Sequence, residues 1–312
     1  MSADAVLSVR NVSKSFGQVR AVVGLSFSVA KGTITGLLGR NGAGKTTTLR
    51  MINGIFLPDA GSIELFGTGD AAAARDRIGY LPEERGLYRK MRVIDQLLFL
   101  AEIKGQRPAA AKPRAEAWLK RFELWDKRAG KLEELSKGNQ QKVQLIGALL
   151  HDPEVVILDE PTSGLDPVNA VLVRNILKDL KAEGRTILLS THMMAEAEKL
   201  VDHIVLIHEG RSVLAGELEE VRNSFGSNSV QLVFEGDGRF LGALPGVASA
   251  RVDTNAAELR LAPGADAQAV LAAAVPRLRV SRFEIAAPSL EEIFIDRVGA
   301  GALERQPAEV VA

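Results

Sequence analysis

A glycine-rich octapeptide that ends in lysine and threonine constrains this chain most. Residues 39–46 read Gly-Arg-Asn-Gly-Ala-Gly-Lys-Thr and fit the pattern Gly-x-x-x-x-Gly-Lys-Ser/Thr. The apolar run 33–38 precedes it and predicts a buried strand, and residues 47–53 can begin a helix. Strand, loop and helix are the setting that a phosphate-binding loop requires. The alternative is a glycine-rich turn with an unrelated lysine, which the spacing and the threonine disfavour.

The residue types of this loop suit a bound phosphate. Glycine has no Cβ, so the backbone of Gly39, Gly42 and Gly44 can take positive φ and close around an anion. The loop N–H groups then point inward, and the N-terminus of the following helix adds positive potential. Lys45 would reach the β- and γ-phosphates of a nucleotide, and the hydroxyl of Thr46 would ligate Mg²⁺.

Composition excludes several classes of function. The 312 residues are enough for about two domains, and 46% apolar with 25% charged residues is a globular balance. Lys+Arg and Asp+Glu both number 39, so no basic field favours nucleic acid as a partner. The absence of cysteine excludes disulfides and thiolate metal sites. No signal peptide and no apolar run of ~18 residues is visible, so we expect the chain to act at a membrane only through a partner.

Hydrophobic patterning predicts an α/β core with a helical insertion. Residues 6–35 alternate like antiparallel strands around a turn at Phe16-Gly17. Residues 85–150 carry mostly helical spacing and are interpreted as an inserted subdomain. Strands and helices alternate through the rest of the core, which indicates a doubly wound sheet. The expected strands are 33–38, 61–67, 77–82, 155–159, 186–190 and 203–207, and the expected helices are 47–53, 93–104, 114–122, 142–150, 168–182 and 193–201.

The last third of the chain changes character. Residues 223–229 are polar and turn-rich, which is typical of a linker. Strand candidates at 230–234, 247–252, 258–261 and 279–285, a helix candidate at 265–274 and a last helix opened by a capping box at 289–292 follow. We therefore expect a first domain over 1–222, a small α+β domain over 230–300 and a flexible tail over 301–312.

Four further constellations follow the octapeptide in order. They are Leu135-Ser-Lys-Gly-Asn-Gln-Gln141, Asp159-Glu160 at the end of a β-run, Ser163-Gly-Leu-Asp166, and His192 after a strand. In this order they resemble the nucleotide-binding subunit of the ABC transporter superfamily, over residues 6 to about 215. The resemblance implies a P-loop NTPase (RecA-like) core with an antiparallel β subdomain and an inserted α-helical subdomain. Any single motif would be weak evidence, whereas the ordered set is specific.

The resemblance also implies ATP and Mg²⁺ as cofactors and a role for each catalytic candidate. Asp159 would hold Mg²⁺ through water, and Glu160 would polarise the attacking water at a strand end beside the phosphate loop. His192 would contact the γ-phosphate, and Lys45 completes the catalytic set. Phe16 would stack on adenine, although a lone aromatic at a turn often only packs.

The same resemblance predicts a site that two subunits share. Ser136 and Gly138 would bind the γ-phosphate of ATP held by the opposite subunit, and Asp166 would lie at the same interface. Such catalysis consists of positioning and charge stabilisation. The residues expected to bind nucleotide are Phe16, Gly39, Asn41, Gly42, Ala43, Gly44, Lys45, Thr46, Thr47, Ser136, Gly138 and Asp166.

The chain departs from the family pattern at three positions. Lys137 and Asn139 replace residues of the usual Leu-Ser-Gly-Gly-Gln motif but leave its serine and second glycine intact. Glu83 stands where the family has a glutamine that ligates Mg²⁺ and reports to the membrane partner. A carboxylate can also ligate Mg²⁺, but near a triphosphate it adds like-charge repulsion. Glu83 is the third expected metal ligand, after Thr46 and Asp159.

Two phrases narrow the resemblance to ATPases of ABC-2-type permeases, the sodium-export and drug-export group. They are Leu81-Pro-Glu-Glu-Arg-Gly-Leu-Tyr88 and Pro288-Ser-Leu-Glu-Glu-Ile-Phe294. We expect an ATPase that dimerises on ATP, with itself or a related ATPase, and powers a separate integral membrane permease. It would lie in the cytoplasm, peripheral on the inner face of the cell membrane. The alternatives are a soluble relative acting on DNA or ribosomes, and a degenerate subunit that binds ATP without hydrolysing it.

Overall fold

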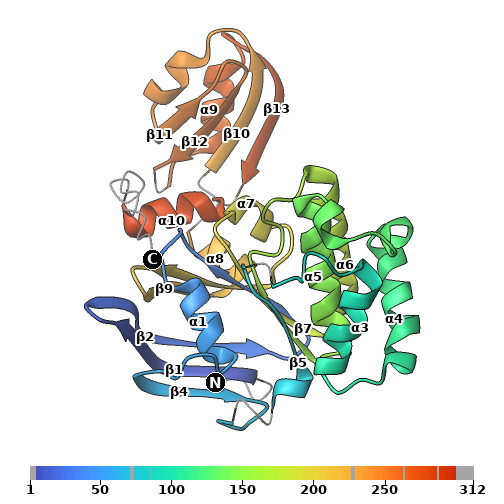
Figure 1. Cartoon of the computed structure of the whole chain (residues 1–312). Coiled ribbons are helices and arrows are strands. Elements are labelled where there is room, and N and C mark those ends of the chain that lie inside the picture. Colours follow the sequence, from blue (N-terminus) through green and yellow to red (C-terminus); the bar gives the residue numbers. More distant parts are fainter. Residues whose placement is uncertain are drawn as a thin grey trace. The chain divides into compact units, whose positions relative to one another are not determined.

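The computed structural model describes residues 5–70, 74–84, 86–225, 229–262, 264–286 and 288–299. These residues form two compact units, one up to Gly216 and one from Glu217 (Figure 1). The division falls before the expected boundary at 222, because the helix α8 (Leu218–Ser224) lies in the second unit. There Arg222 Nε donates to the carbonyl oxygen of Pro288 at 3.3 Å. The expected linker is described only in part, and the expected tail lies outside the described residues.

A six-stranded sheet in the order β5-β6-β7-β3-β8-β9 forms the centre of the first unit. Its strands are β3 (Ile34–Leu38), β5 (Ile78–Leu81), β6 (Val155–Asp159), β7 (Thr186–Thr191), β8 (His203–His208) and β9 (Arg211–Glu217). The pairs from β5 to β8 are parallel, whereas β9 follows β8 after two residues and must return antiparallel to it. Every residue of β3, β6 and β7 is buried, as in parallel sheets covered on both faces.

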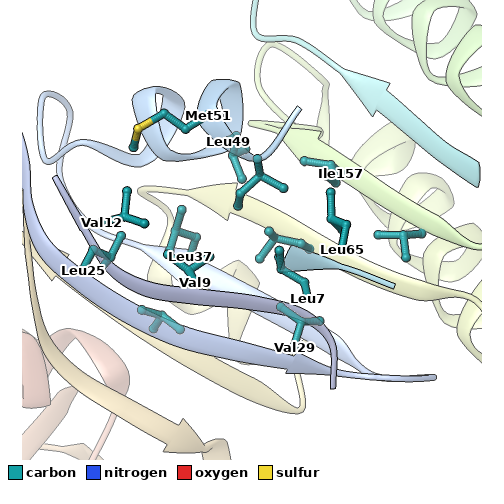
Figure 2. Packing of buried hydrophobic residues seen from close by; sticks show 14 of the residues in the cluster. Leu7, Val9, Val12, Leu25, Val29, Leu37, Leu49, Met51, Leu65 and Ile157 are labelled. Atoms are coloured by element: carbon teal, nitrogen blue, oxygen red, sulfur yellow. The ribbon is translucent and has the colours of Figure 1, made fainter. Parts of the chain in front are cut away.

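A second, antiparallel sheet and the helix α1 (Lys45–Ile52) share one hydrophobic cluster with the parallel sheet (Figure 2). The strands are β1 (Ala5–Phe16), β2 (Val19–Ala30) and β4 (Ala60–Leu65), in the order β2-β1-β4. The cluster includes Leu7, Val9, Leu25 and Leu65 from this sheet, Leu49 and Met51 from α1, and Leu37 and Ile157 from the parallel sheet. Each fully buried Leu or Val side chain contributes about 1.5–3 kcal/mol. The cluster thus fixes α1, and with it the loop that precedes α1.

The helices of the insertion pack on one another, and α5 contacts β5 (Figure 1). The helices after α1 in the first unit are α3 (Val93–Ile103), α4 (Pro108–Arg121), α5 (Lys137–Leu149), α6 (Pro167–Ala182) and α7 (Met194–Ala197), with 3₁₀ turns η1 (Arg75–Arg77), η2 (Trp125–Lys127) and η3 (Leu132–Glu134). The helix α4 begins at Pro108 instead of the expected residue 114, because proline suits the first position of a helix. The helix expected at 193–201 is wrong in length. It ends at Ala197, whose carbonyl accepts from both Leu200 N and Val201 N in a closing turn.

The second unit has a split β-α-β arrangement. After α8, its described elements are β10 (Ser229–Glu235), the 3₁₀ helix η4 (Gly238–Ala243), β11 (Val247–Val252), β12 (Ala256–Leu261), α9 (Ala267–Ala274), β13 (Arg279–Ala286) and α10 (Leu290–Val298). The sheet order is β11-β12-β10-β13, and all its pairs are antiparallel. With η4 in the place of the first helix, this is the β-α-β-β-α-β topology of ferredoxin-like domains. The core contains Val230, Phe234 and Leu259 with Val270 of α9.

Candidate nucleotide-binding site

The loop between β3 and α1 leaves no room for side chains at two of its glycines. Gly39 has φ 159°, and a Cβ there would lie 2.3 Å from the carbonyl oxygen of Ile207. Gly44 has φ 104°, and a Cβ there would lie 2.4 Å from the carbonyl oxygen of Ala21. Between them Asn41 is exposed, so the tip of the loop faces solvent while its two ends are packed against the core. This is the open, glycine-lined loop that anion binding requires.

Lys45 is buried at the start of α1. Its ammonium donates to the carbonyl oxygens of Gly39 at 2.8 Å and Arg40 at 3.2 Å. It also lies 3.6 Å from Oε1 of Glu160. Burial lowers the pKa of Lys45, and the nearby carboxylates of Glu160 and Asp159 oppose that shift. The structure therefore brings the phosphate loop, the expected catalytic lysine and the expected catalytic carboxylate into one cluster.

Asp159 ends β6 with one carboxylate oxygen satisfied and one not. The hydroxyl of Ser190, its register partner on β7, donates to Oδ1. Oδ2 is buried and has no hydrogen-bond partner among the described residues. Burial raises the pKa of Asp159, and the Ser190 hydrogen bond opposes this. A buried oxygen without a partner fits a ligand of a hydrated cation.

Glu160 holds a strained backbone conformation. Its φ is 49°, which is uncommon for a residue with a side chain and clusters at functional sites. Its backbone N–H donates to both the carbonyl and the hydroxyl oxygen of Ser190, each at 3.2 Å. Oε1 accepts from the backbone N–H of His192 at 3.1 Å and lies 2.9 Å from His192 Nδ1, while Oε2 accepts from Thr191 Oγ1 at 3.2 Å. The carboxylate is therefore held at both oxygens.

Ser190 and Thr191 were not among the residues predicted from the sequence. Ser190 contacts Asp159 and Glu160, and Thr191 contacts Glu160 while its carbonyl accepts from Gly39 N at 3.3 Å. They are hydroxyl residues at the end of the strand that lies between β3 and β6. The available signal was the Ser-Thr pair directly before His192, but the strand order was needed to use it.

Glu83 lies close to Thr46. Thr46 Oγ1 donates to Glu83 Oε2 at 3.4 Å. Glu83 follows the end of β5 by two residues. The neighbouring Glu84 points to a different partner and pairs with Arg50 at 2.9 Å. Among the described residues no group of three or more His, Cys, Asp or Glu side chains can hold a metal alone. A cation at Thr46, Asp159 and Glu83 would therefore also need oxygens from a ligand such as a nucleotide.

Phe16 is 44% exposed at the end of β1. Its ring meets that of Phe56 edge to face at 5.3 Å between centroids. Lys14 Nζ lies 5.7 Å from the Phe16 centroid and pairs with Asp59 at 2.7 Å. Phe16 thus has both a packing partner and an exposed surface, so either of its expected roles suits the geometry.

The segments 135–141 and 163–166, here called the signature loop and the aspartate loop, pack on each other. Ser136 caps α5 by accepting from Asn139 N at 3.3 Å. Asp166 caps α6 by accepting from Asn169 N at 3.0 Å. A Cβ at Gly138 would lie 3.3 Å from the side chain of Leu165. Among the described residues, no hydrogen bond or ion pair joins Ser136 or Asp166 to the cluster around Lys45.

A phosphate loop ahead of α1, with two acids at the end of a parallel strand, defines a P-loop NTPase. Residues 22–163 match the family described as ABC transporter, and residues 216–298 match the C-terminal domain of ATP-binding proteins like DrrA1-3. The chain is 43% identical to the ABC transporter ATP-binding protein YhaQ of Bacillus subtilis, over 95% of this chain and 99% of YhaQ. It therefore belongs to the family of ABC transporter ATP-binding proteins and is an ATPase of that family.

Exporter proteins are among its relatives. The chain is 33% identical to daunorubicin resistance ATP-binding protein DrrA3 of Streptomyces coeruleorubidus, over 95% of this chain and 97% of that one. It is 43% identical to Nod factor export ATP-binding protein I of Burkholderia orbicola, over 68% and 71%. A solved ATP-binding subunit of an ABC transporter superposes with a TM-score of 0.66 at 33% identity, covering 71% of this chain and 93% of that one. These findings confirm the expected family and fold class.

Proposed function

We propose that this chain binds and hydrolyses ATP as the energy-supplying subunit of an ABC-2-type exporter. The observation that carries the catalytic part is the cluster of Lys45, Glu160 and His192, which are joined by contacts of 2.9–3.6 Å. This cluster lies at the carboxyl ends of the parallel strands. The export part is supported by the relatives named for Nod factor export and daunorubicin resistance.

The site residues divide the work of phosphoryl transfer. The loop N–H groups and Lys45 bind the triphosphate, and Phe16 offers its exposed ring to the base. Glu160 accepts a hydrogen bond from the attacking water, and His192, 2.9 Å from Glu160 Oε1, orients that carboxylate. Water oxygen bonds to the γ-phosphorus as the bond to the β–γ bridging oxygen breaks, which releases ADP and phosphate.

Mg²⁺ is the proposed metal. Thr46 and Asp159 would hold it, with Glu83 as a third oxygen ligand, and Asp159 would act through water. When bound, the ion neutralises charge on the β- and γ-phosphates. The unpartnered Oδ2 of Asp159 supports this assignment.

A dimer would complete each site. Ser136, Gly138 and Asp166 are separate from the Lys45 cluster within the described part of one chain. The phosphate-binding role of Ser136 and Gly138, and the interface role of Asp166, therefore need a second subunit. That subunit is a copy of this chain or a related ATPase. The helix N-terminus behind Ser136 would add positive potential toward the γ-phosphate.

An integral membrane permease is the proposed partner, with no nucleic acid involved. None of the helices in the described segments is both long and apolar enough to cross a lipid bilayer. We place the subunit in the cytoplasm, on the inner face of the cell membrane. Co-purification of a permease with the tagged chain from its native membrane tests this part, and isolation with ribosomes or DNA instead would contradict it.

Turnover of the purified protein tests the catalytic part. We expect Mg²⁺-dependent ATP hydrolysis by the wild-type chain and a loss of about 100-fold or more in Glu160→Gln, a barrier change near 2.7 kcal/mol. ATP binding by Glu160→Gln should stay close to wild type, because the loop and Lys45 are unchanged. Equal turnover of the two proteins would overturn the assignment of Glu160.

A further inference from the structure

Lys142 is a buried lysine in the second turn of α5, directly after the signature loop. Only 3% of its surface is exposed. Burial lowers the pKa of Lys142, and Glu123 and Asp166 oppose this while Lys127 adds to it. An ammonium that is taken out of water needs a strong acceptor, and within the described segments one side-chain hydrogen bond satisfies this one. The acceptor is Oδ1 of Asn169 on α6, at 2.8 Å.

Asn169 also bonds to the aspartate loop. Its Nδ2 donates to Oδ2 of Asp166 at 2.5 Å, and its backbone N–H donates to Oδ1 of Asp166 at 3.0 Å. An ammonium only donates and a carboxylate only accepts, so the amide of Asn169 fits between them in one orientation only. Lys142, Asn169 and Asp166 therefore form a directional relay from α5 to the start of α6.

The relay connects the signature loop and the aspartate loop, which both lie at the interface of the proposed dimer. Ser136 is the N-cap of α5, and Asp166 is the N-cap of α6. Gly138 also packs against Leu165, because a Cβ at Gly138 would lie only 3.3 Å from the Leu165 side chain. A packing contact alone allows α5 to slide or rotate over the aspartate loop, whereas a charged hydrogen bond fixes direction and distance.

We propose that Lys142 is a positioning residue, which locks the signature loop and the aspartate loop of one subunit into a single rigid surface for the nucleotide of its partner. This inference rests on the proposed function, because it assigns Lys142 to the shared half of the site. It separates two steps: ATP binding at the Lys45 cluster does not need the relay, whereas closure of two subunits around ATP does.

The test compares both steps in the full-length chain. Lys142→Met keeps the length and apolar stem of the side chain but removes the ammonium. Binding of a fluorescent ATP analogue should change less than about twofold, while ATP-driven dimerisation in a Glu160→Gln background should weaken about tenfold or more, near 1.4 kcal/mol. Analytical ultracentrifugation measures the dimer. Lys142→Arg should restore most of the loss, and the exposed Lys127→Met serves as the matched control.

Other outcomes distinguish the relay from the proposed function. If Glu160→Gln itself stays monomeric with ATP, the proposed ATP-dependent dimer fails and the relay fails with it. If Glu160→Gln dimerises and the added Lys142→Met changes nothing, only the relay is overturned. Asn169→Ala removes the amide that links Lys142 to Asp166. It serves as the second test if Lys142→Met does not fold. Loss of dimerisation in Asn169→Ala supports the relay, and unchanged dimerisation overturns it.

Discussion

Thr191 connects three parts of the site through one residue. Its hydroxyl donates to Oε2 of Glu160 at 3.2 Å and accepts from Met193 N at 3.1 Å, and its carbonyl accepts from Gly39 N. It is almost fully buried, at 3% exposure. When a buried hydroxyl that serves a carboxylate oxygen and a backbone N–H is removed, each of these two groups loses this hydrogen bond.

Thr191→Val should therefore lower kcat with little effect on nucleotide affinity. Valine keeps the shape of threonine, so the loop and Lys45 keep their positions while Glu160 loses one hydrogen bond. We expect a loss of about 10–100-fold in kcat, corresponding to roughly 1.4–2.7 kcal/mol. Steady-state kinetics and equilibrium ATP binding separate the two effects. Thr191→Ser should recover most of the activity, and a kcat unchanged in Thr191→Val would refute this role.

Glu83→Gln should keep ATPase activity. A glutamine oxygen can still accept from Thr46 Oγ1, and the loss of one negative charge reduces repulsion of a triphosphate. Turnover at saturating Mg²⁺ and ATP measures the effect, with Glu84→Gln as the control because Glu84 pairs with Arg50 instead. A fall of more than about 100-fold in turnover of Glu83→Gln alone would show that the carboxylate is essential.

Sequence reasoning located the site by its motifs and missed the residues that depend on strand order. Lys45, Asp159, Glu160 and His192 lie in one cluster, as the motifs predicted, although their roles stay predictions. The contacts of Ser190 and Thr191 could not be predicted, because Asp159 and Ser190 are register partners only once β7 lies beside β6. Sheet order is a non-local property, and no local pattern encodes it.

At the scale of elements, exposure explains what the sequence did not predict. The strand β9 is mostly exposed or half-buried, so it lacks the apolar run that marks β3 or β6. The helix α8 begins directly where β9 ends, without a turn signal between them. A well-predicted element such as α6 combines a clear helical period with a capping residue, Asp166, at its start.

The junction between α5 and β5 should make stability depend on pH. His151 follows α5, is buried, and has Nε2 2.9 Å from the carbonyl oxygen of Ile78. Burial lowers the pKa of His151 from its usual 6.5, and Lys104 acts in the same direction. The hydrogen bond to the Ile78 carbonyl and the carboxylates of Asp76 and Asp152 oppose this shift. The unfolded chain therefore binds the proton first on acidification. The stability from His151 is complete above pH 6.5 and is lost as the pH falls from there through the folded-state pKa.

His151→Gln should remove part of this pH dependence. Glutamine keeps an N–H donor for Ile78 but does not titrate near neutral pH. Urea unfolding midpoints at pH 7.5 and below 6 measure the effect, and wild type should lose up to roughly 1.4 kcal/mol more per pH unit than the variant. The idea fails if the two proteins show the same pH slope.

At the scale of the whole molecule, the first unit contains every residue proposed to bind nucleotide. A chain that ends at Gly216 should fold and bind ATP within about threefold of the full-length affinity, because the hydrophobic cluster around α1 uses only residues of the first unit. Circular dichroism checks folding, and a fluorescent ATP analogue measures binding. A truncated chain that is folded but does not bind nucleotide would contradict this division of labour.

The second unit shows the limit of prediction at this scale. The strands β10 to β13 and the helices α9 and α10 were expected close to their observed bounds, whereas α8 and η4 were not, and only the label α+β followed from the prediction. The β-α-β-β-α-β order requires the pairings of β10 with β12 and β13, which are distant in sequence. Short strands with several possible partners leave such pairings open until the sheet is seen.

The central claim is that each ATP is held by Lys45 of one subunit and closed in by the signature loop of another. Lys45→Ala removes the first half-site. Ser136→Asp keeps the cap of α5, because aspartate also caps helices, but places a carboxylate where the γ-phosphate would approach. Each variant alone should show almost no ATPase activity, while each retains the half-site that the other lacks.

Mixing the two inactive variants is therefore the most direct measurement. Half of the dimers would contain one of each, and each mixed dimer would hold one intact site, so the account predicts ATPase activity of up to roughly a quarter of wild type. Activity that stays at the background of the separate variants at every mixing ratio, with both proteins folded, would contradict a site shared between two copies of this chain.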